Sequence, residues 1–453
     1  MKKEIKTILL VFFVFGTLLV SGCGCKQSSN NYRMNLEVWG FLDDREALSA
    51  VFDNYKKINK NIAGITYRKL STDTYKKELI EALASGQGPD IFMISNSWLP
   101  SFQNKLVSAP ADIFNEQTYR NNFVDTASDD FISQGSIWAA PLSVDSLGLY
   151  YNKDMFNVAG ITSPPKTWNE FLSDVKLLTR VDSDGEITQS GVAMGTAYNI
   201  NRSTDLLGML MLQSGTKMSN EDLQVTFNSD NGRNALNFYT QFAKSASPTY
   251  SWNPKMHYSI DAFSEGKTAM MFNYSWHIQT IRSKSPKLNF AVAKIPQFSE
   301  SAPVNYSNYW AMTVAKNKIA SVPSGNPAVS NDIRVKEAWK FIRYLTAKPD
   351  GTLAAADQSI GSVTDKNFDP AATYLEKDKS PAARKDLIEA QKTDPDLGAF
   401  AWGNLIARNW KQADPESVEL IMSEMIDQVN KGNAGVDEAI NAAVSKINKS
   451  ISK

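Results

Sequence analysis

The segment between residues 36 and 94 alternates between strand and helix patterns, and this alternation constrains the fold more than any other feature. Short apolar runs occupy residues 36–40, 62–70 and 91–94, whereas residues 47–58 and 75–84 repeat apolar side chains at helical spacing. Strands that alternate with helices form a parallel sheet that helices cover on both faces. The pattern therefore predicts an α/β fold, with ligands bound beyond the carboxyl ends of the strands.

Candidate ligand contacts stand where two of these strands end. Trp39 lies at the end of the first strand, and a short polar run leads from the third strand to Trp98. Because the carboxyl ends of parallel strands share one edge of a sheet, we expect Trp39 and Trp98 on the same rim. The alternative for Trp39 is packing in the core.

Size and charge limit the class of protein. A chain of 453 residues is too long for one comfortable core, so two domains or lobes are expected. Its 48 basic and 48 acidic side chains balance. This balance argues against nucleic acid as a partner, because surfaces that bind nucleic acid are basic. The 10 Trp and 16 Tyr residues favour a search for an aromatic-lined site.

The N-terminus resembles that of a bacterial lipoprotein. Three lysines precede a short apolar run over residues 7–20, which fits a secretory signal better than a permanent membrane span. Small residues then lead into Cys23, as in a lipobox, in which cleavage exposes the cysteine to acylation. We expect a signal peptide at 1–22, a lipid on Cys23 and a flexible tether at 23–34. The alternative is an ordinary signal with an incidental cysteine, and the role of Cys25 stays open.

The stretch over residues 137–156 places a carboxylate inside a strand-forming run. Burying an unpaired charge is costly, so Asp145 either has a partner that holds it structurally or faces a cleft. We favour the hypothesis that this stretch crosses between two lobes and that Asp145 faces the ligand. A second apolar run over residues 309–315, which contains Trp310, is expected to cross back.

Short motifs follow one another along most of the chain. They read LEVWG at 36–40, ASGQGPDI at 84–91, PLSVDSL at 141–147, YYNKD at 150–154, PPKTW at 164–168 and GKTAM at 266–270. In this order, and behind a lipobox, they resemble the extracellular solute-binding proteins of ABC importers, the group that includes maltose-binding protein. The resemblance extends from about residue 36 to about residue 345.

The resemblance implies a type II periplasmic-binding-protein fold. This is a two-lobed α/β fold in which each lobe is a mainly parallel sheet flanked by helices, and crossing hinge strands join the lobes. The first lobe is expected to comprise residues 35–144 and about 311–375. The second is expected to comprise residues 145–310 and about 376–453.

The function implied by the resemblance is capture, not chemistry. Such a protein closes over a solute, most often a sugar or oligosaccharide, and docks on a membrane permease that a cytoplasmic ATPase drives. We expect a monomer without cofactor or metal, held outside the cytoplasm in the cell envelope by its N-terminal lipid.

Particular residues also take roles from the resemblance. Asp145 matches a hinge acid that often hydrogen-bonds sugar hydroxyls, and Trp276 matches an aromatic that stacks on a sugar ring. Flat aromatic side chains suit the apolar faces of a sugar, and carboxylates suit its hydroxyl rim. The candidate ligand-binding set is Asp145, Trp39, Trp98, Trp276, Trp310 and Trp402, of which Trp402 aligns only loosely. The polar loop over residues 198–201 is a further candidate to line the second lobe.

Three rival functions stay open on the sequence alone. A secreted glycoside hydrolase needs two carboxylates that flank one bond, and no motif marks such a pair. A ferric-ion carrier could use Tyr150 and Tyr151, although consecutive strand residues point to opposite faces. A peptide or polyamine binder predicts extra carboxylates in the cleft in place of extra tryptophans.

Overall fold

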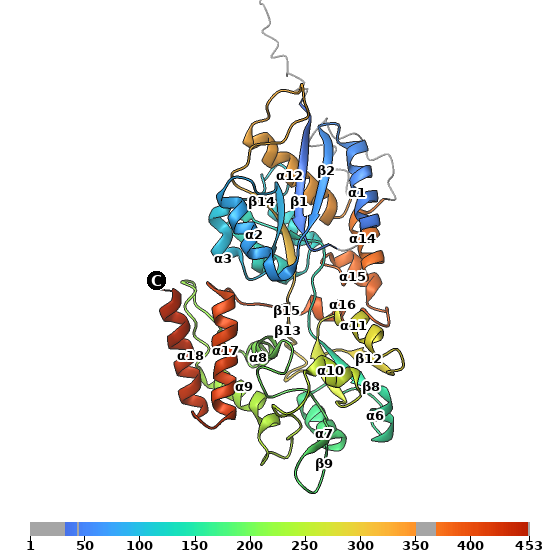
Figure 1. The fold of residues 1–453 in the computed structure, drawn as a ribbon, viewed down its shortest axis with the longest axis vertical. Coiled ribbons are helices and arrows are strands. Elements are labelled where there is room, and N and C mark those ends of the chain that lie inside the picture. The colour runs from blue at the N-terminus through green and yellow to red at the C-terminus, as the bar shows by residue number, and fades with distance from the viewer. Residues whose placement is uncertain (1–31, 43–44, 350–367, 452–453) are drawn as a thin grey trace, which may run out of the picture.

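The computed structural model describes residues 32–42, 45–349 and 368–451. The expected signal peptide, the lipidated Cys23 and the tether before residue 32 lie outside the described residues. The described elements form two lobes along the long axis of the molecule, with the first lobe at the top of Figure 1 and the second at the bottom. No helix in these three ranges is long and apolar enough to cross a membrane.

The first lobe is built from two separate parts of the chain. Its elements are β1 (Met34–Gly40), α1 (Arg45–Ile58), β2 (Ile62–Lys69), α2 (Thr72–Ala84), β3 (Ile91–Ser95), α3 (Leu99–Phe102), η1 (Gln103–Lys105), β4 (Leu106–Val107), α4 (Glu116–Asn122), α5 (Asp125–Phe131), β5 (Ile132–Ser133), β6 (Ser136–Ile137), β7 (Ala140–Pro141), β14 (Trp310–Ala315), α12 (Asn331–Thr346), α14 (Pro370–Asp378) and α15 (Lys385–Gln391).

The sheet of the first lobe has the order β2-β1-β3-β14-β4, with β7 also paired to β14. Strands β1, β2 and β3 run parallel, as the alternating pattern predicts. Strand β14 is antiparallel to β3, β4 and β7. The run over residues 309–315, expected to be a crossing strand, is thus mainly an inner strand of this sheet. Its apolar character reflects burial inside the lobe.

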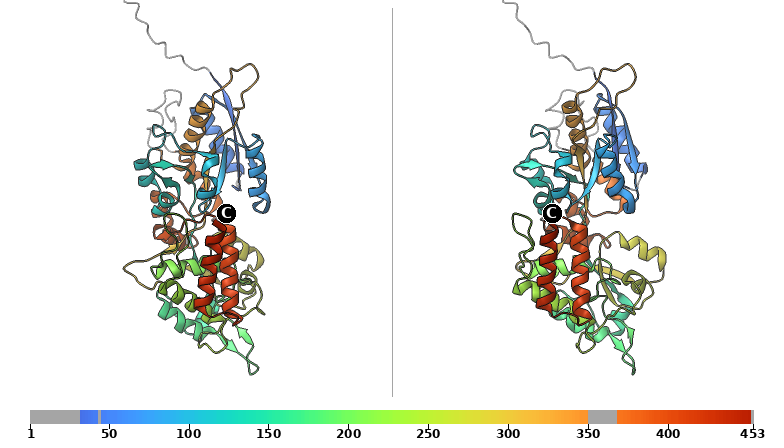
Figure 2. Two further views of the ribbon diagram at one scale, coloured as in Figure 1. Left: turned by 90° about the vertical axis from the view of Figure 1, so that its left-hand side faces the viewer. Right: turned by 60° about the vertical axis from the view of Figure 1, so that its left-hand side comes forward.

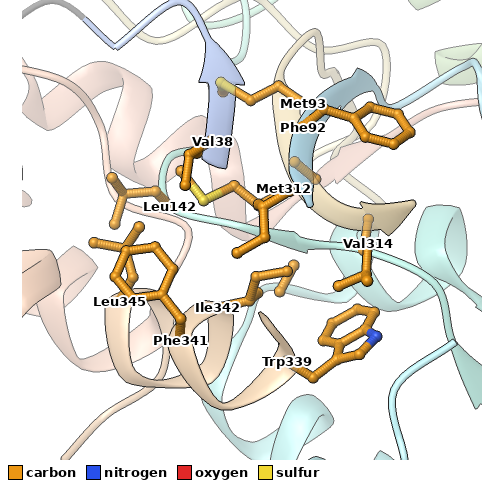
Figure 3. Packing of buried hydrophobic residues seen from close by; sticks show 14 of the residues in the cluster. Val38, Phe92, Met93, Leu142, Met312, Val314, Trp339, Phe341, Ile342 and Leu345 are labelled. Atoms are coloured by element: carbon orange, nitrogen blue, oxygen red, sulfur yellow. The ribbon is translucent and has the colours of Figure 1, made fainter. Parts of the chain in front are cut away.

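Helix α12 covers one face of this sheet. Figure 3 shows Phe341, Ile342 and Leu345 of α12 packed below Val38 and Met312 of the strands. All five side chains are fully or almost fully buried. This core fixes the end of β3 and the start of β14, and the residues there face the second lobe.

The second lobe is also discontinuous. Its elements are β8 (Gly148–Asn152), α6 (Lys153–Val158), α7 (Trp168–Leu178), β9 (Arg180–Val181), β10 (Ile187–Gln189), α8 (Ser203–Gln213), α9 (Asp230–Thr240), η2 (Gln241–Ala243), α10 (Ser259–Ser264), β11 (Met270–Asn273), α11 (His277–Lys284), β12 (Phe290–Ala293), α17 (Pro415–Asn430) and α18 (Val436–Ile451). Figure 2 shows α17 and α18 side by side along one flank of the lobe.

The main sheet of the second lobe differs from the expectation of a mainly parallel sheet. Its order is β11-β8-β12, and β8 is antiparallel to both neighbours. Strand β8 is the first element after the chain leaves the first lobe, and it lies between β11 and β12 in the sheet. Helix α11 connects β11 to β12. An apolar run identifies a strand but not its direction, so the sequence pattern could not give this arrangement.

Within the described ranges, three passages of the chain connect the lobes. Ser146 on the first passage bridges Ser307 on the second, and Ser143 bridges Ala382 near the third. Around the second and third passages lie β13 (Asn305–Tyr306), α16 (Gly398–Leu405) and β15 (Ala407–Arg408), of which β13 and β15 pair in parallel.

The buried cores show where the chain changes lobe. The chain passes from the first buried cluster to the second between Val144 and Leu147, and it returns to the first between Tyr306 and Tyr309. After the expected third boundary at residue 375, Ala382, Ala383 and Ile388 still pack in the first core. The second lobe therefore starts later than the expected residue 376. The reason is that α15 lies against the first lobe.

Candidate ligand-binding site

A cleft between the lobes contains two adjoining compartments. The larger, here the aromatic compartment, has a volume of about 460 Å³ and includes Asp145, Ser275 and Trp276 in its lining. The smaller, here the polar compartment, has a volume of about 200 Å³ and is lined by residues of both lobes. Asn308 and Trp310 line both compartments, so the two form one continuous candidate site.

Trp276 is the second lobe's aromatic contribution to the cleft. It follows β11 and occupies the cap position just before α11, and 43% of its side chain is exposed. Its indole stacks on Tyr274 with ring centroids 4.6 Å apart and an interplanar angle of 18°. Stacking on a sugar ring is thus restricted to the opposite face of the indole.

Asp145 holds the loop that carries Trp276. One oxygen, Oδ2, accepts hydrogen bonds from the backbone N–H of Ser275 at 2.9 Å and from its hydroxyl at 2.6 Å. The other, Oδ1, accepts from the backbone N–H of Ser146 at 2.9 Å. Burial raises the pKa of Asp145 to about 7, although these three donors act in the opposite direction. Asp145 therefore lines the cleft and also supports the loop after β11.

Trp98 and Trp310 form the first lobe's aromatic contribution. Trp98 stacks on Phe102 at 5.0 Å and 15°, and it meets Trp310 edge-on at 5.0 Å. Phe41 packs against Trp310, with ring centroids 4.5 Å apart. Because neighbours fix both rings, this wall is preorganised before a ligand arrives.

Trp39 and Trp402 do not join these residues. Trp39 is 4% exposed in the first core, where its indole N–H donates to Glu37 at 2.8 Å. The position of a residue at a strand end does not decide which face its side chain takes, and here Trp39 turns inward. Trp402 lies on α16 with the ammonium groups of Lys294 and Lys392 over its ring, at 3.8 and 4.4 Å from the centroid. Neither tryptophan lines either compartment of the cleft in the described chain.

The polar compartment contains residues that the sequence analysis did not select. Arg202 and Asp205 come from the start of α8, Glu419 comes from α17, and Asn308 comes from the second passage between the lobes. The carboxylate of Asp205 accepts hydrogen bonds from the Tyr274 hydroxyl at 2.8 Å and from Asn308 Nδ2 at 3.4 Å. In the sequence, only the polar loop over residues 198–201 indicated that this region could line the cleft.

That polar loop mostly bonds within the second lobe. Asn199 donates to the backbone carbonyls of Asn253 and Met256 at 2.9 and 3.0 Å. Asn201 donates to the Tyr258 hydroxyl at 2.8 Å. The loop therefore positions Arg202 instead of supplying the lining itself.

A second buried carboxylate lies beside the passages between the lobes. Asp130 accepts hydrogen bonds from the Tyr309 hydroxyl at 2.7 Å and from Asn96 Nδ2 at 3.4 Å. Its burial raises its pKa to about 7. Tyr309 precedes β14 directly, so Asp130 fixes the chain where it enters the first lobe.

The tyrosine pair considered for iron lies elsewhere. The hydroxyl of Tyr150 is buried and donates to the backbone carbonyl of Tyr274 at 2.6 Å. Its neighbour Tyr151 packs against Phe156 at 4.9 Å. Within the described ranges, no group of three or more His, Cys, Asp or Glu side chains is placed to hold a metal ion.

Comparison with known proteins places the chain in a family. Residues 42–352 match the family described as Bacterial extracellular solute-binding protein. The chain belongs to this family. Its resemblance to solute-binding proteins, seen in the short motifs, is thereby confirmed.

The individual relatives share about a quarter of their aligned residues with this chain. A maltotriose-binding protein of Pyrococcus abyssi is 23% identical over 270 residues, which are 59% of this chain and 53% of that protein. A mannitol-binding protein of Pseudomonas aeruginosa is 25% identical over 284 residues, or 61% of this chain and 60% of that protein. The chain thus spans less than two thirds of the length of each relative.

Solved structures share the fold. The cyclic α-maltosyl-1,6-maltose binding protein of Arthrobacter globiformis is 20% identical with a TM-score of 0.68, and the match covers 92% of this chain and 99% of that one. The expected two-lobed α/β fold of periplasmic binding proteins is therefore confirmed, with the antiparallel second-lobe sheet as its departure from the expectation.

Proposed function

We propose that this protein captures a sugar or oligosaccharide between its lobes and delivers it to the membrane permease of an ABC importer. The observation that carries the proposal is the cleft, where Trp276 of one lobe and Trp310 of the other line one compartment together with Asp145. Relatives named for maltotriose and mannitol support a sugar or sugar alcohol as the ligand. The protein acts as a binding component and not as an enzyme.

The lining suits the two surfaces of a sugar. Indole rings bury the apolar C–H face of a pyranose with little loss of rotamer freedom. Hydroxyl groups at the sugar rim require donors and acceptors, which Asn308 and the carboxylate side chains supply. Trp98, Trp310, Trp276 and Asp145 are the proposed contacts, whereas Trp39 and Trp402 are not.

A ligand screen tests this function. The purified protein is mixed with mono- and oligosaccharides and sugar alcohols, with ferric salt, amino acids and a polyamine as controls, and its melting temperature and tryptophan fluorescence are measured. We expect stabilisation by a sugar or sugar alcohol, because a ligand that binds only the native state raises its stability. Stabilisation by iron or a polyamine alone would refute the proposal, and turnover of a glycan would assign an enzyme.

The proposed anchor is a lipid on Cys23 behind a signal peptide at 1–22, which would hold a monomer at the outer face of a membrane. The lipobox pattern and the extracellular family support it. Cys23→Ser is expected to move the protein from the membrane fraction to the soluble fraction and to abolish labelling by a fatty acid. Cys25→Ser is the matched control. Unchanged labelling of Cys23→Ser would exclude this anchor.

A further inference from the structure

The guanidinium group of Arg202 lies in the polar compartment, where one of its hydrogen-bond donors is buried without use. This donor, Nε, has no hydrogen-bond partner among the residues that the structure describes. In the described chain the side chain forms no ion pair, and its guanidinium carbon lies 5.9 Å from the centroid of the Trp276 ring. A buried donor without a partner costs free energy, so such an atom in a native protein needs an explanation.

The backbone of Arg202 is also in a costly conformation. Its φ is +61° and its ψ is 33°, which is the left-handed region that residues other than glycine seldom adopt. Arg202 caps α8 without a side-chain capping bond. Strain of this kind clusters at ligand-binding sites, where the surrounding structure holds a side chain in a functional position. The strained backbone and the unused Nε donor thus point to the same residue independently.

The charges around Arg202 restrict what can bind beside it. The charged lining of this compartment consists of Arg202, Asp205, Glu416 and Glu419. Glu416 already pairs with Lys76 of the first lobe at 2.7 Å, which leaves two carboxylates, Asp205 and Glu419, beside one guanidinium. The remaining charge of the compartment is therefore negative, so an anionic ligand is repelled more than a neutral one.

We propose that Arg202 and Asp205 together bind a hydroxyl group of a neutral sugar and that the polar compartment selects against uronic acids. A hydroxyl group both accepts and donates a hydrogen bond. Its oxygen can accept from the Arg202 guanidinium while its proton is donated to the Asp205 carboxylate, whose Oδ2 is already oriented by Tyr274 and Asn308. This inference rests on the proposed function and names the class of sugar at the same site.

The first experiment compares ligands. Maltotriose and a panel of neutral mono- and oligosaccharides are titrated into the wild-type protein, each beside a uronic acid of similar ring structure. We expect at least tenfold tighter binding of the neutral ligand than of its charged counterpart. A charged counterpart that binds as tightly or more tightly would overturn the inference while leaving sugar binding intact. If no sugar of any class binds, the proposed function fails as well.

The second experiment compares variants with the best neutral ligand from that panel. Arg202→Met removes the charge but keeps the length of the side chain, and it is expected to weaken binding about tenfold to 100-fold, as loss of hydrogen bonds to a charged group does. Arg202→Lys should restore only part of the affinity, because an ammonium lacks the planar fork of a guanidinium. Arg180→Met, at an exposed position on β9, is the matched control and should bind like wild type.

The stability of the ligand-free variants separates binding from a structural role. We expect the melting temperature of ligand-free Arg202→Met to equal or exceed that of wild type, because the substitution removes an unpaired buried donor. Unchanged affinity of Arg202→Met, or weaker binding that is matched by a lower melting temperature without ligand, would overturn the assignment.

Discussion

The two walls of the cleft are built in different ways. On the first-lobe wall, Trp98 and Trp310 pack against each other and against Phe41 and Phe102, and Trp98 is only 8% exposed. On the second-lobe wall, Trp276 is 43% exposed and lies on a loop that Asp145 fastens through Ser275. The first wall is thus part of a core, whereas the second is held by a few hydrogen bonds. Substitutions in the first wall should therefore lower the stability of the protein, whereas substitutions in the second wall should mainly weaken ligand binding.

Trp98→Ala should have the largest effect on stability. Removing a buried indole leaves a cavity beside Phe102 and Trp310, and we expect the free energy of unfolding to fall by about 3 kcal/mol. Denaturant unfolding measures this loss. A change below about 1 kcal/mol would show that the first wall is not packed as a core and would remove the contrast with the second wall.

Asp145→Ala should have an intermediate effect. It leaves the buried N–H and hydroxyl of Ser275 without their acceptor, which is expected to cost about 2 kcal/mol and to loosen the loop that carries Trp276. Ser275→Ala, which removes only the hydroxyl donor, serves as the milder comparison. Wild-type stability together with lost binding would instead assign Asp145 to the ligand alone.

Trp276→Ala should affect binding far more than stability. The side chain is largely exposed, so its removal should change the free energy of unfolding by less than about 1 kcal/mol. Affinity for the sugar should fall about tenfold or more, as measured by calorimetric titration. Trp402→Ala is the matched control, since Trp402 is 41% exposed and lies outside the cleft. Equal affinities of the two variants would remove Trp276 from the site.

The pH dependence of stability reports on the two buried carboxyl groups. Burial raises the pKa of Asp130 and of Asp145 from 3.8 to about 7. Between about pH 4 and pH 7 the native state therefore holds protons that the unfolded state has lost, so stability falls as the pH rises through this window. Each carboxyl contributes up to about 1.4 kcal/mol per pH unit.

Asp130→Asn tests this slope, because an amide oxygen can still accept from Tyr309 and Asn96. We expect the variant to lose less stability than wild type between pH 4 and pH 7 in denaturant unfolding. Asp222→Asn, at an exposed position, should keep the wild-type slope. An equal slope in Asp130→Asn would mean that Asp130 titrates near its ordinary value.

The sequence predicted the parts of the fold that local patterns determine. The alternation from residue 36 to 94 indicated β1, α1, β2, α2 and β3 because apolar spacing reports burial directly. The direction of β8 and the place of β14 depend on strands far away in the chain, and periodicity carries no information about them. The motif resemblance supplied the two-lobed arrangement that local patterns lack.

The residues of the site were also predictable only in part. Asp145 stood out because it lies inside an apolar run, and Trp276 stood out because it matches an aromatic of the family; the structure brings both into one compartment. Trp39 was selected because it ends a strand, but the face it takes depends on packing inside the first lobe. Arg202 was missed because its proximity to Glu419 results from the packing of α17 against the second lobe. Charged residues before a helix are common, and only tertiary structure makes this one unusual.

A crystal structure with the sugar that binds most tightly in the ligand screen tests the central claim most directly. The account predicts the sugar between the lobes, with one ring against Trp276 and hydroxyl groups within hydrogen-bond distance of Asn308 and Arg202. A sugar bound outside the two compartments, or inside them without contact to either lobe's tryptophans, would contradict it.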